Sequence, residues 1–140
     1  MNHADRQRWL GTAILVGVVY PVVGVMFAQL SGAAGSARIG FIWRLSAFLV
    51  SGLVFGAHIA YEHLRLRSPA RLLAWHTAAA VAIGGFLLAL VANIHDLGSS
   101  AGYRPRMLIA LAAWPLLTAV PAYIVALLLA AGLGMKRLRV

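Results

Sequence analysis

Two histidines and one glutamate are the side chains in this sequence best placed to do chemistry. His58 lies near the end of one long apolar segment, and His76 lies near the start of the next. At a rise of about 1.5 Å per residue, both imidazoles are expected roughly 5 to 6 Å inside the same boundary. Glu62 follows His58 by one helical turn and shares its face. The sequence therefore predicts two imidazoles at one level on adjacent helices, with Glu62 beside His58.

Three interpretations of this group differ in what it binds. In the first, which we favour, the histidines are hydrogen-bonded core or interface residues, and Glu62 is satisfied by His58 or by a nearby arginine. In the second, His58 and His76 bind a cofactor, as the two ligands of one b-type haem. In the third, His58, Glu62 and His76 bind a divalent metal such as zinc.

The segment from His58 to His63 superficially resembles metalloprotease motifs, but its spacing differs from theirs. Those motifs place two histidines four residues apart, on one face of a helix. Here the interval is five residues, which separates the side chains by about 140° around the helix axis. One metal ion cannot readily take both, so we reject a metalloprotease site and predict no catalytic residues.

One face of the second apolar segment carries polar side chains at intervals of seven residues: Arg44, Ser51, His58 and Arg65. Ionisable groups within a membrane span are costly and normally face the interior of a bundle, so they are a functional hypothesis by default. For Arg44 we favour a structural explanation, in which it snorkels to the nearby boundary or pairs with Asp96.

Small residues at intervals of four lie beside this polar face, at Gly52, Gly56 and Ala60. Such spacing lets helix backbones approach each other closely in lipid. We favour packing inside one bundle as its explanation, with the seam of a homodimer as the alternative.

A second polar group is expected near the opposite boundary, and it comprises Gln29, Arg44, Asn93, His95 and Asp96. These side chains line an outer vestibule, or they cap helix ends and satisfy one another's hydrogen bonds. The second explanation is favoured. In the last apolar segment, Pro115 and Pro121 predict a bent helix.

The amino-acid composition indicates that most of the chain lies in lipid and not in water. Of its 140 residues, 62% are hydrophobic and 11% are charged, and the mean hydropathy is +0.87. A chain this small cannot hide so much apolar surface from water. The absence of cysteine excludes thiolate chemistry and iron–sulfur clusters. Three acidic residues are too few for a di-iron carboxylate site.

Four long apolar segments are expected to cross a bilayer, at residues 9–30, 39–61, 72–94 and 107–133. Without water in the hydrocarbon core each must be a helix. Short connections between long helices favour antiparallel neighbours. The predicted fold is therefore an all-α membrane protein whose four transmembrane helices form one up-down-up-down antiparallel bundle.

Basic residues predict the orientation of this bundle. Eight Lys or Arg lie at the two ends of the chain and in the middle connection, against three in the other connections. Both termini are then expected in the cytoplasm, with the chain in the inner membrane of a bacterium. The basic residues are expected to attract anionic lipid headgroups. Because they divide between two membrane faces, we predict no nucleic-acid partner.

The function expected from these features is that of a small non-enzymatic membrane protein, which is an accessory subunit of a membrane complex or a homo-oligomer. A redox protein with one b-type haem or a metal at His58 and His76 is one alternative. An oligomeric channel or transporter protomer that uses Arg44, Glu62 and the histidines is another.

Overall fold

The computed structural model describes residues 3–98 and 107–137 and shows an all-helical chain over these ranges. The helices are α1 (His3–Gly32), α2 (Ala37–Tyr61), α3 (Ala70–Leu97) and α4 (Met107–Arg137), and α2 continues into a π-helical turn, η1 (Glu62–Leu66). All four long helices have the length and apolar composition needed to cross a membrane. The all-α prediction is confirmed, and each predicted span lies inside one helix. Their up-down order across a bilayer stays a prediction.

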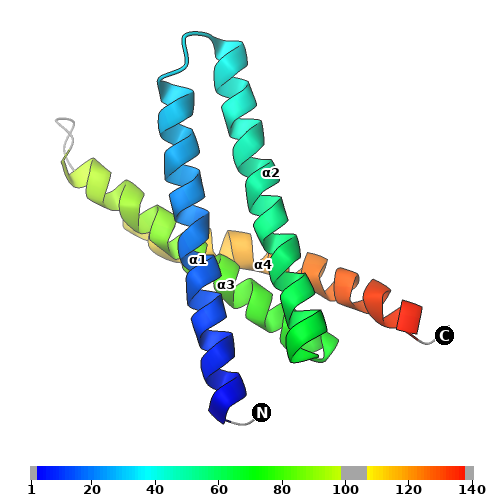
Figure 1. Cartoon of the computed structure of the whole chain (residues 1–140). Helices are drawn as coiled ribbons and strands as arrows, with labels where there is room; N and C mark the ends of the chain where they lie inside the picture. Colours follow the sequence, from blue (N-terminus) through cyan, green and yellow to red (C-terminus); the bar gives the residue numbers. More distant parts are fainter. Residues whose placement is uncertain (1–2, 99–106, 138–140) are drawn as a thin grey trace.

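The helices form two antiparallel pairs that cross each other. In Figure 1, α1 and α2 stand side by side, and the pair formed by α3 and α4 passes behind them in a different direction. Helix α3 lies at the centre of this arrangement, because it packs against both α1 and α4. The helices are thus not all aligned with one another, and α2 has little contact with α3 above its last turns.

Glycines make the crossing of α1 over α3 possible. A β-carbon at Gly17 would lie 2.7 Å from Cγ2 of Ile83, and one at Gly84 would lie 2.9 Å from Cβ of Tyr20. On the other face of α3, a β-carbon at Gly85 would lie 2.7 Å from Oγ1 of Thr118. Real β-carbons almost never come this close to another atom. The contacts of α3 with both neighbours therefore depend on the absence of a side chain.

Helix α2 is the most exposed part of the first pair. Its buried residues are Gly40, His58 and Ile59, whereas α3 buries ten. Phe48 is 79% exposed and Leu53 is 73% exposed. A lipid environment explains such apolar exposure, because lipid tails are as apolar as these side chains.

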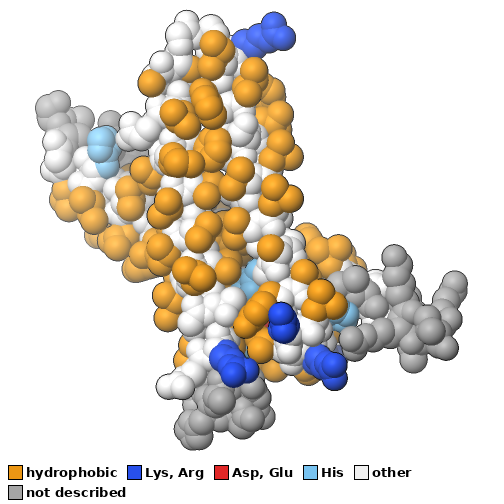
Figure 2. Space-filling view, in the orientation of Figure 1, with side chains coloured by type: hydrophobic (Ala, Val, Ile, Leu, Met, Phe, Trp, Pro, Cys, Tyr) orange, Lys and Arg blue, Asp and Glu red, His pale blue; other side chains and the backbone are white. Residues whose placement is uncertain are grey.

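The outer surface of the α1–α2 pair is built for that environment. Figure 2 shows hydrophobic side chains along the length of this face and Lys or Arg side chains at its two ends. This distribution matches an apolar band between two polar interfaces, and it indicates a membrane protein. An apolar core closes the lower end of the molecule, where Ile59 of α2 packs with Leu73 and Ala74 of α3 and with Ala126 and Ala130 of α4.

Candidate functional site

A change of helical pitch places Glu62 at the heart of the candidate site. The regular α-helix ends at Tyr61, and the wider turn η1 begins at Glu62. Arg67 then adopts a left-handed conformation with φ of 51°, and its backbone N–H donates to the carbonyl of Glu62. The backbone N–H of Ser68 donates to the same carbonyl at 3.3 Å. This sharp ending turns the connection back over the Glu62 side chain, which is 0% exposed.

The carboxylate of Glu62 is held by groups from two other parts of the chain. The Ser68 hydroxyl donates to Oε2 at 2.8 Å. Nδ1 of His76, on α3, lies 3.1 Å from each carboxylate oxygen. A buried carboxylate is stable only when such partners replace its lost water. Glu62 is therefore satisfied by a histidine and a serine, and no arginine contact with it is found within the described residues.

His76 links the carboxylate to the first helix. Its side chain is buried, and its ring stacks on the indole of Trp9, with ring centroids 4.3 Å apart and an interplanar angle of 28°. Trp9 lies near the start of α1. Side chains from α1, the end of α2, the following connection and α3 therefore meet at one point.

His58 is the incompletely bonded member of the group. It is 3% exposed, yet neither ring nitrogen has a hydrogen-bond partner within the described residues. Nε2 of His58 lies 3.8 Å from Oε1 of Glu62, which is beyond hydrogen-bond range. Buried polar atoms without partners are uncommon and call for an explanation. We refer to His58, Glu62, Ser68 and His76 as the Glu62 cluster.

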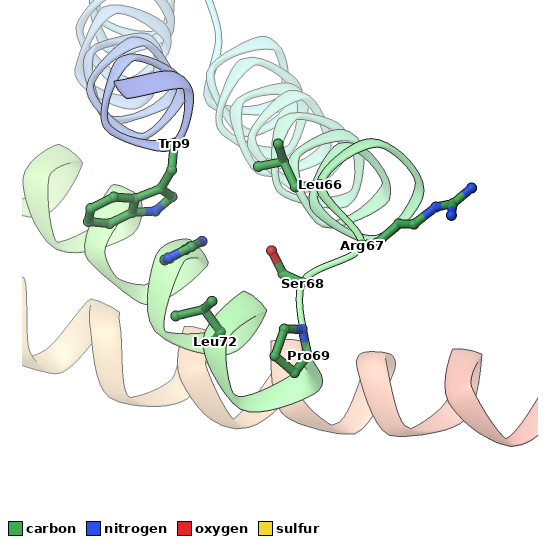
Figure 3. A pocket seen from close by; sticks show the side chains of 7 residues that line it. Trp9, Leu66, Arg67, Ser68, Pro69 and Leu72 are labelled. Carbon is green, nitrogen blue, oxygen red and sulfur yellow. The ribbon is translucent and has the colours of Figure 1, made fainter. Parts of the chain in front are cut away.

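A cavity of about 320 Å³ lies against this cluster. Figure 3 shows Trp9 on one side of it, the end of α2 on another, and Ser68 and Pro69 of the connection between them, while His76 belongs to its wall. The Ser68 hydroxyl points into this space, and the Arg67 side chain points away from it. Arg67 and Pro69 are exposed, so the cavity reaches the surface beside the α2–α3 connection.

The other predicted polar residues lie elsewhere. Arg44 is exposed, and its Nε donates to Oγ of Ser31 at the α1–α2 turn, at 3.1 Å. It is separated from Glu62 by eighteen residues of α2, or about 27 Å of helix. Near the end of α3, Asn93 is buried and donates to the carbonyls of Ala89 and Met107, at 2.9 Å each.

The residues that follow Asn93 are more accessible. His95 is exposed and Asp96 is half-buried. The α1–α2 turn and the end of α3 lie at different corners of the molecule in Figure 1. Arg44 is therefore not brought together with Asn93 and His95, and the structure favours local capping over one shared vestibule.

The predicted small-residue stripe faces open space. A β-carbon at Gly52 or at Gly56 would meet no atom within 4 Å, and Ala60 is exposed. Next to Gly52 lies an apolar groove of about 600 Å³, to which all four helices contribute. Half-buried Ser51 and Tyr20 line it. Within the described residues the stripe thus packs against nothing, and the close contacts of the fold are made by the glycines of α1 and α3 instead.

The geometry of the cluster is that of hydrogen-bonded side chains. Among the described residues, no group of three or more His, Asp or Glu side chains is arranged so that it could hold a metal ion. One nitrogen of each imidazole lies within 4 Å of Glu62. An iron atom shared by both histidines would have to use the other nitrogens or displace the carboxylate. The haem and metal interpretations gain no support here and stay predictions.

Sequence reasoning missed Ser68 and the stacking role of Trp9. Ser68 has no helical spacing to Glu62, because the π-helical turn and left-handed Arg67 separate them. Trp9 is typical of the aromatic belt at a membrane boundary, a pattern that does not reveal its ring partner. Comparisons with protein-family models, with curated proteins and with solved structures find no match to this chain.

Proposed function

We propose that this chain is a non-enzymatic integral membrane protein that acts as an accessory subunit of a membrane complex or as a homo-oligomer, and that it associates through α2. The observation that carries the proposal is the uncovered small-residue face of α2. A β-carbon at Gly52 or Gly56 would meet nothing within 4 Å, and large apolar side chains such as Leu49 and Leu53 flank these glycines, at 62% and 73% exposed.

The packing of α1 on α3 shows how glycines on a helix surface allow a second helix to approach closely. There, Gly17 and Gly84 let two helices approach so closely that a β-carbon would clash. In lipid, helix association depends on this kind of close packing. The hydrophobic effect does not drive it, because lipid tails are as apolar as the helix surfaces. Helix α2 has two glycines four residues apart, Gly52 and Gly56, and a β-carbon at either would meet nothing within 4 Å, so a helix from a second subunit is its natural partner.

The proposed setting is the inner membrane of a bacterium, with both termini in the cytoplasm. The uneven division of basic residues between the connections supports this orientation. The same residues favour anionic headgroups on the cytoplasmic face. A reporter that works only in the cytoplasm, fused after Val140, is expected to be active. A reporter that needs export is expected to be inactive there, and the opposite pair of results contradicts the orientation.

The mass of the purified protein in mild detergent tests the association. The natural chain is expected to run as an oligomer or with co-purifying subunits, and G52L together with G56L is expected to release it as a monomer. G11L is the matched control, because a β-carbon at Gly11 also meets nothing within 4 Å and this residue lies outside the stripe. A natural chain that is monomeric and free of partners contradicts the proposal, as does equal loss of assembly in the control.

Two alternatives from the sequence remain predictions beside this one. A visible absorption spectrum and a metal analysis of the purified protein test the redox alternative, which requires a Soret band or bound metal that depends on His76. Flux measurements in proteoliposomes test the channel or transporter alternative. Flux that is unchanged by E62Q and H58A would contradict it.

A further inference from the structure

We propose that the Glu62 cluster is a proton-binding site, and that protons enter it through the cavity beside Trp9 and Ser68. The site is complete within one chain, so the proposal does not depend on how subunits associate. It assigns a role to the two features that the proposed association leaves unexplained, which are the fully buried carboxylate and the unpartnered imidazole of His58.

The cluster brings together one carboxylate and two imidazoles, and all three side chains are buried. Histidine is the side chain whose ordinary range of ionisation covers about pH 5 to 8. Nδ1 of His76 lies 3.1 Å from both oxygens of Glu62. Nε2 of His58 lies 3.8 Å from Oε1. A proton that reaches any one of the three groups thus has a neighbour to which it can pass.

The cavity supplies the entry. Its volume of about 320 Å³ greatly exceeds the roughly 15 Å³ that one water molecule requires. His76 belongs to its wall, and the ring atom of His76 that bonds to Glu62 is Nδ1. Water in the cavity can therefore approach the side of the His76 ring that does not face Glu62.

Each transfer conserves protons and charge. Nε2 of neutral His76 accepts a proton from cavity water and forms an imidazolium, whose Nδ1–H donates to the carboxylate. Release of the Nδ1 proton to Glu62 leaves a neutral imidazole and a carboxylic acid. The acid then passes its proton to Nε2 of His58, which becomes an imidazolium beside a carboxylate. This last transfer requires the His58 side chain to move closer, because 3.8 Å exceeds a hydrogen bond.

The groups that face the cluster from the neighbouring elements do not compete for these protons. Trp9 faces it from α1 and Ser68 from the connection, and neither ionises in the relevant range. Arg67 at the cavity rim is a permanent cation. From α4, the packing beside the cluster is by Ala126 and Ala130, with the partly buried side chains of Tyr123 and Leu127 next to them.

Infrared spectroscopy of the full chain in lipid nanodiscs tests the site, after metal analysis of the same sample. The chain has only three acidic residues, so a carboxyl band can be assigned by substitution. Between about pH 5 and 8 we expect a reversible carboxyl signal that disappears in E62Q and persists in D96N. A signal unaffected by E62Q, or no signal in this range, overturns the proposal. A metal ion bound by these side chains also overturns it.

Nitrogen-15 spectra of the labelled natural chain provide a readout that needs no variant at Glu62. We expect the resonances of His58 and His76 to change together with pH, whereas those of exposed His95 change independently. Independent titration of His58 and His76 contradicts a shared site.

Filling the cavity tests the entry route. Leu72 lies in its wall, and L72W is expected to slow the response of the Glu62 carboxyl band to a pH jump by at least tenfold. L64W is the matched control, because Leu64 is 65% exposed and lies outside the cavity wall. Equal response rates in L72W and L64W overturn the route through this cavity.

Discussion

The two ends of the α2 segment share one pattern of polar side chains at intervals of seven residues but have opposite environments. From Arg44 to Gly56 its side chains are mostly exposed, and its small residues face open space. From His58 to Glu62 the segment reaches the crossing of the two helix pairs and carries buried polar groups, of which Glu62 is held by Ser68 of the connection and by His76 of α3. Periodicity alone does not distinguish these regions. The two regions differ in whether another helix lies against them. The angle at which the two helix pairs cross determines which part of α2 has such a neighbour.

The comparison teaches that α2 is attached to the second pair only near its end, where the Glu62 carboxylate contacts His76 and Ile59 packs against α3 and α4. At its upper end the polar contact is between exposed Arg44 and Ser31. At the lower end it is a buried carboxylate with two donors. The same bond type contributes more where water is absent, so the two ends are expected to respond very differently to substitution.

The largest effect is expected from E62A. Removal of the buried carboxylate leaves the Ser68 hydroxyl and Nδ1 of His76 without their partner and costs about 3 kcal/mol of unfolding free energy. Denaturant unfolding in detergent, followed by circular dichroism, measures this loss. R65A is the control, because Arg65 is exposed on the same turn. Equal stability of the two variants would mean that the buried end of α2 does not anchor the fold.

The next largest effect compares glycines that are covered with glycines that are open. G17A is expected to lower the unfolding free energy by about 1–3 kcal/mol, because the new methyl group is forced against Ile83. G52A is expected to leave the stability of the isolated chain unchanged, because the added atom meets nothing. The comparison fails if G52A is as destabilising as G17A in a monomeric preparation.

A smaller effect is expected at the stacked ring. W9L removes the contact between α1 and His76 and is expected to cost about 1 kcal/mol. Thermal unfolding of the purified chain measures it. The control is W114L, since Trp114 is 50% exposed on α4. If both variants lose the same stability, the stack adds nothing beyond burial.

The smallest effect is expected at the upper end of α2. R44Q replaces an exposed side chain that bonds to Ser31, and its cost is expected to stay below about 0.5 kcal/mol. The unfolding free energy of R44Q, measured under the same conditions as that of E62A, gives the smallest expected loss of stability in the series. A loss as large as that of E62A would show that both ends of α2 are anchored alike.

The helices could be predicted from the sequence because each one depends on the residues of its own segment. The long apolar segments located all four helices, and counting residues from their ends predicted one level for His58, Glu62 and His76, of which both imidazoles lie within 4 Å of the Glu62 carboxylate in the structure. Hydrophobicity and rise per residue are properties of one segment, so they need no knowledge of its neighbours.

What the sequence did not reveal depends on pairs of distant residues. The crossing rests on Gly17 meeting Ile83 and on Gly85 meeting Thr118, and many other small residues in the chain have the same local pattern. The approach of Ser68 to Glu62 depends on the left-handed backbone at Arg67. Residues other than glycine rarely adopt this conformation, so an arginine in the sequence does not predict it. The small-residue stripe of α2 is another such case. Its spacing favours packing inside the bundle, but spacing does not show whether another helix lies against the stripe, and a β-carbon at Gly52 or Gly56 meets nothing within 4 Å.

The order in which the chain is made gives the position of His76 a consequence for biogenesis. Synthesis delivers α1 and α2 to the membrane before α3, because the chain emerges from its N-terminus. Until α3 follows, Trp9 has no ring to stack on and Glu62 lacks its imidazole partner. Until His76 is made, the first hairpin therefore lacks the two contacts that join Trp9 and Glu62 to α3 in the folded chain.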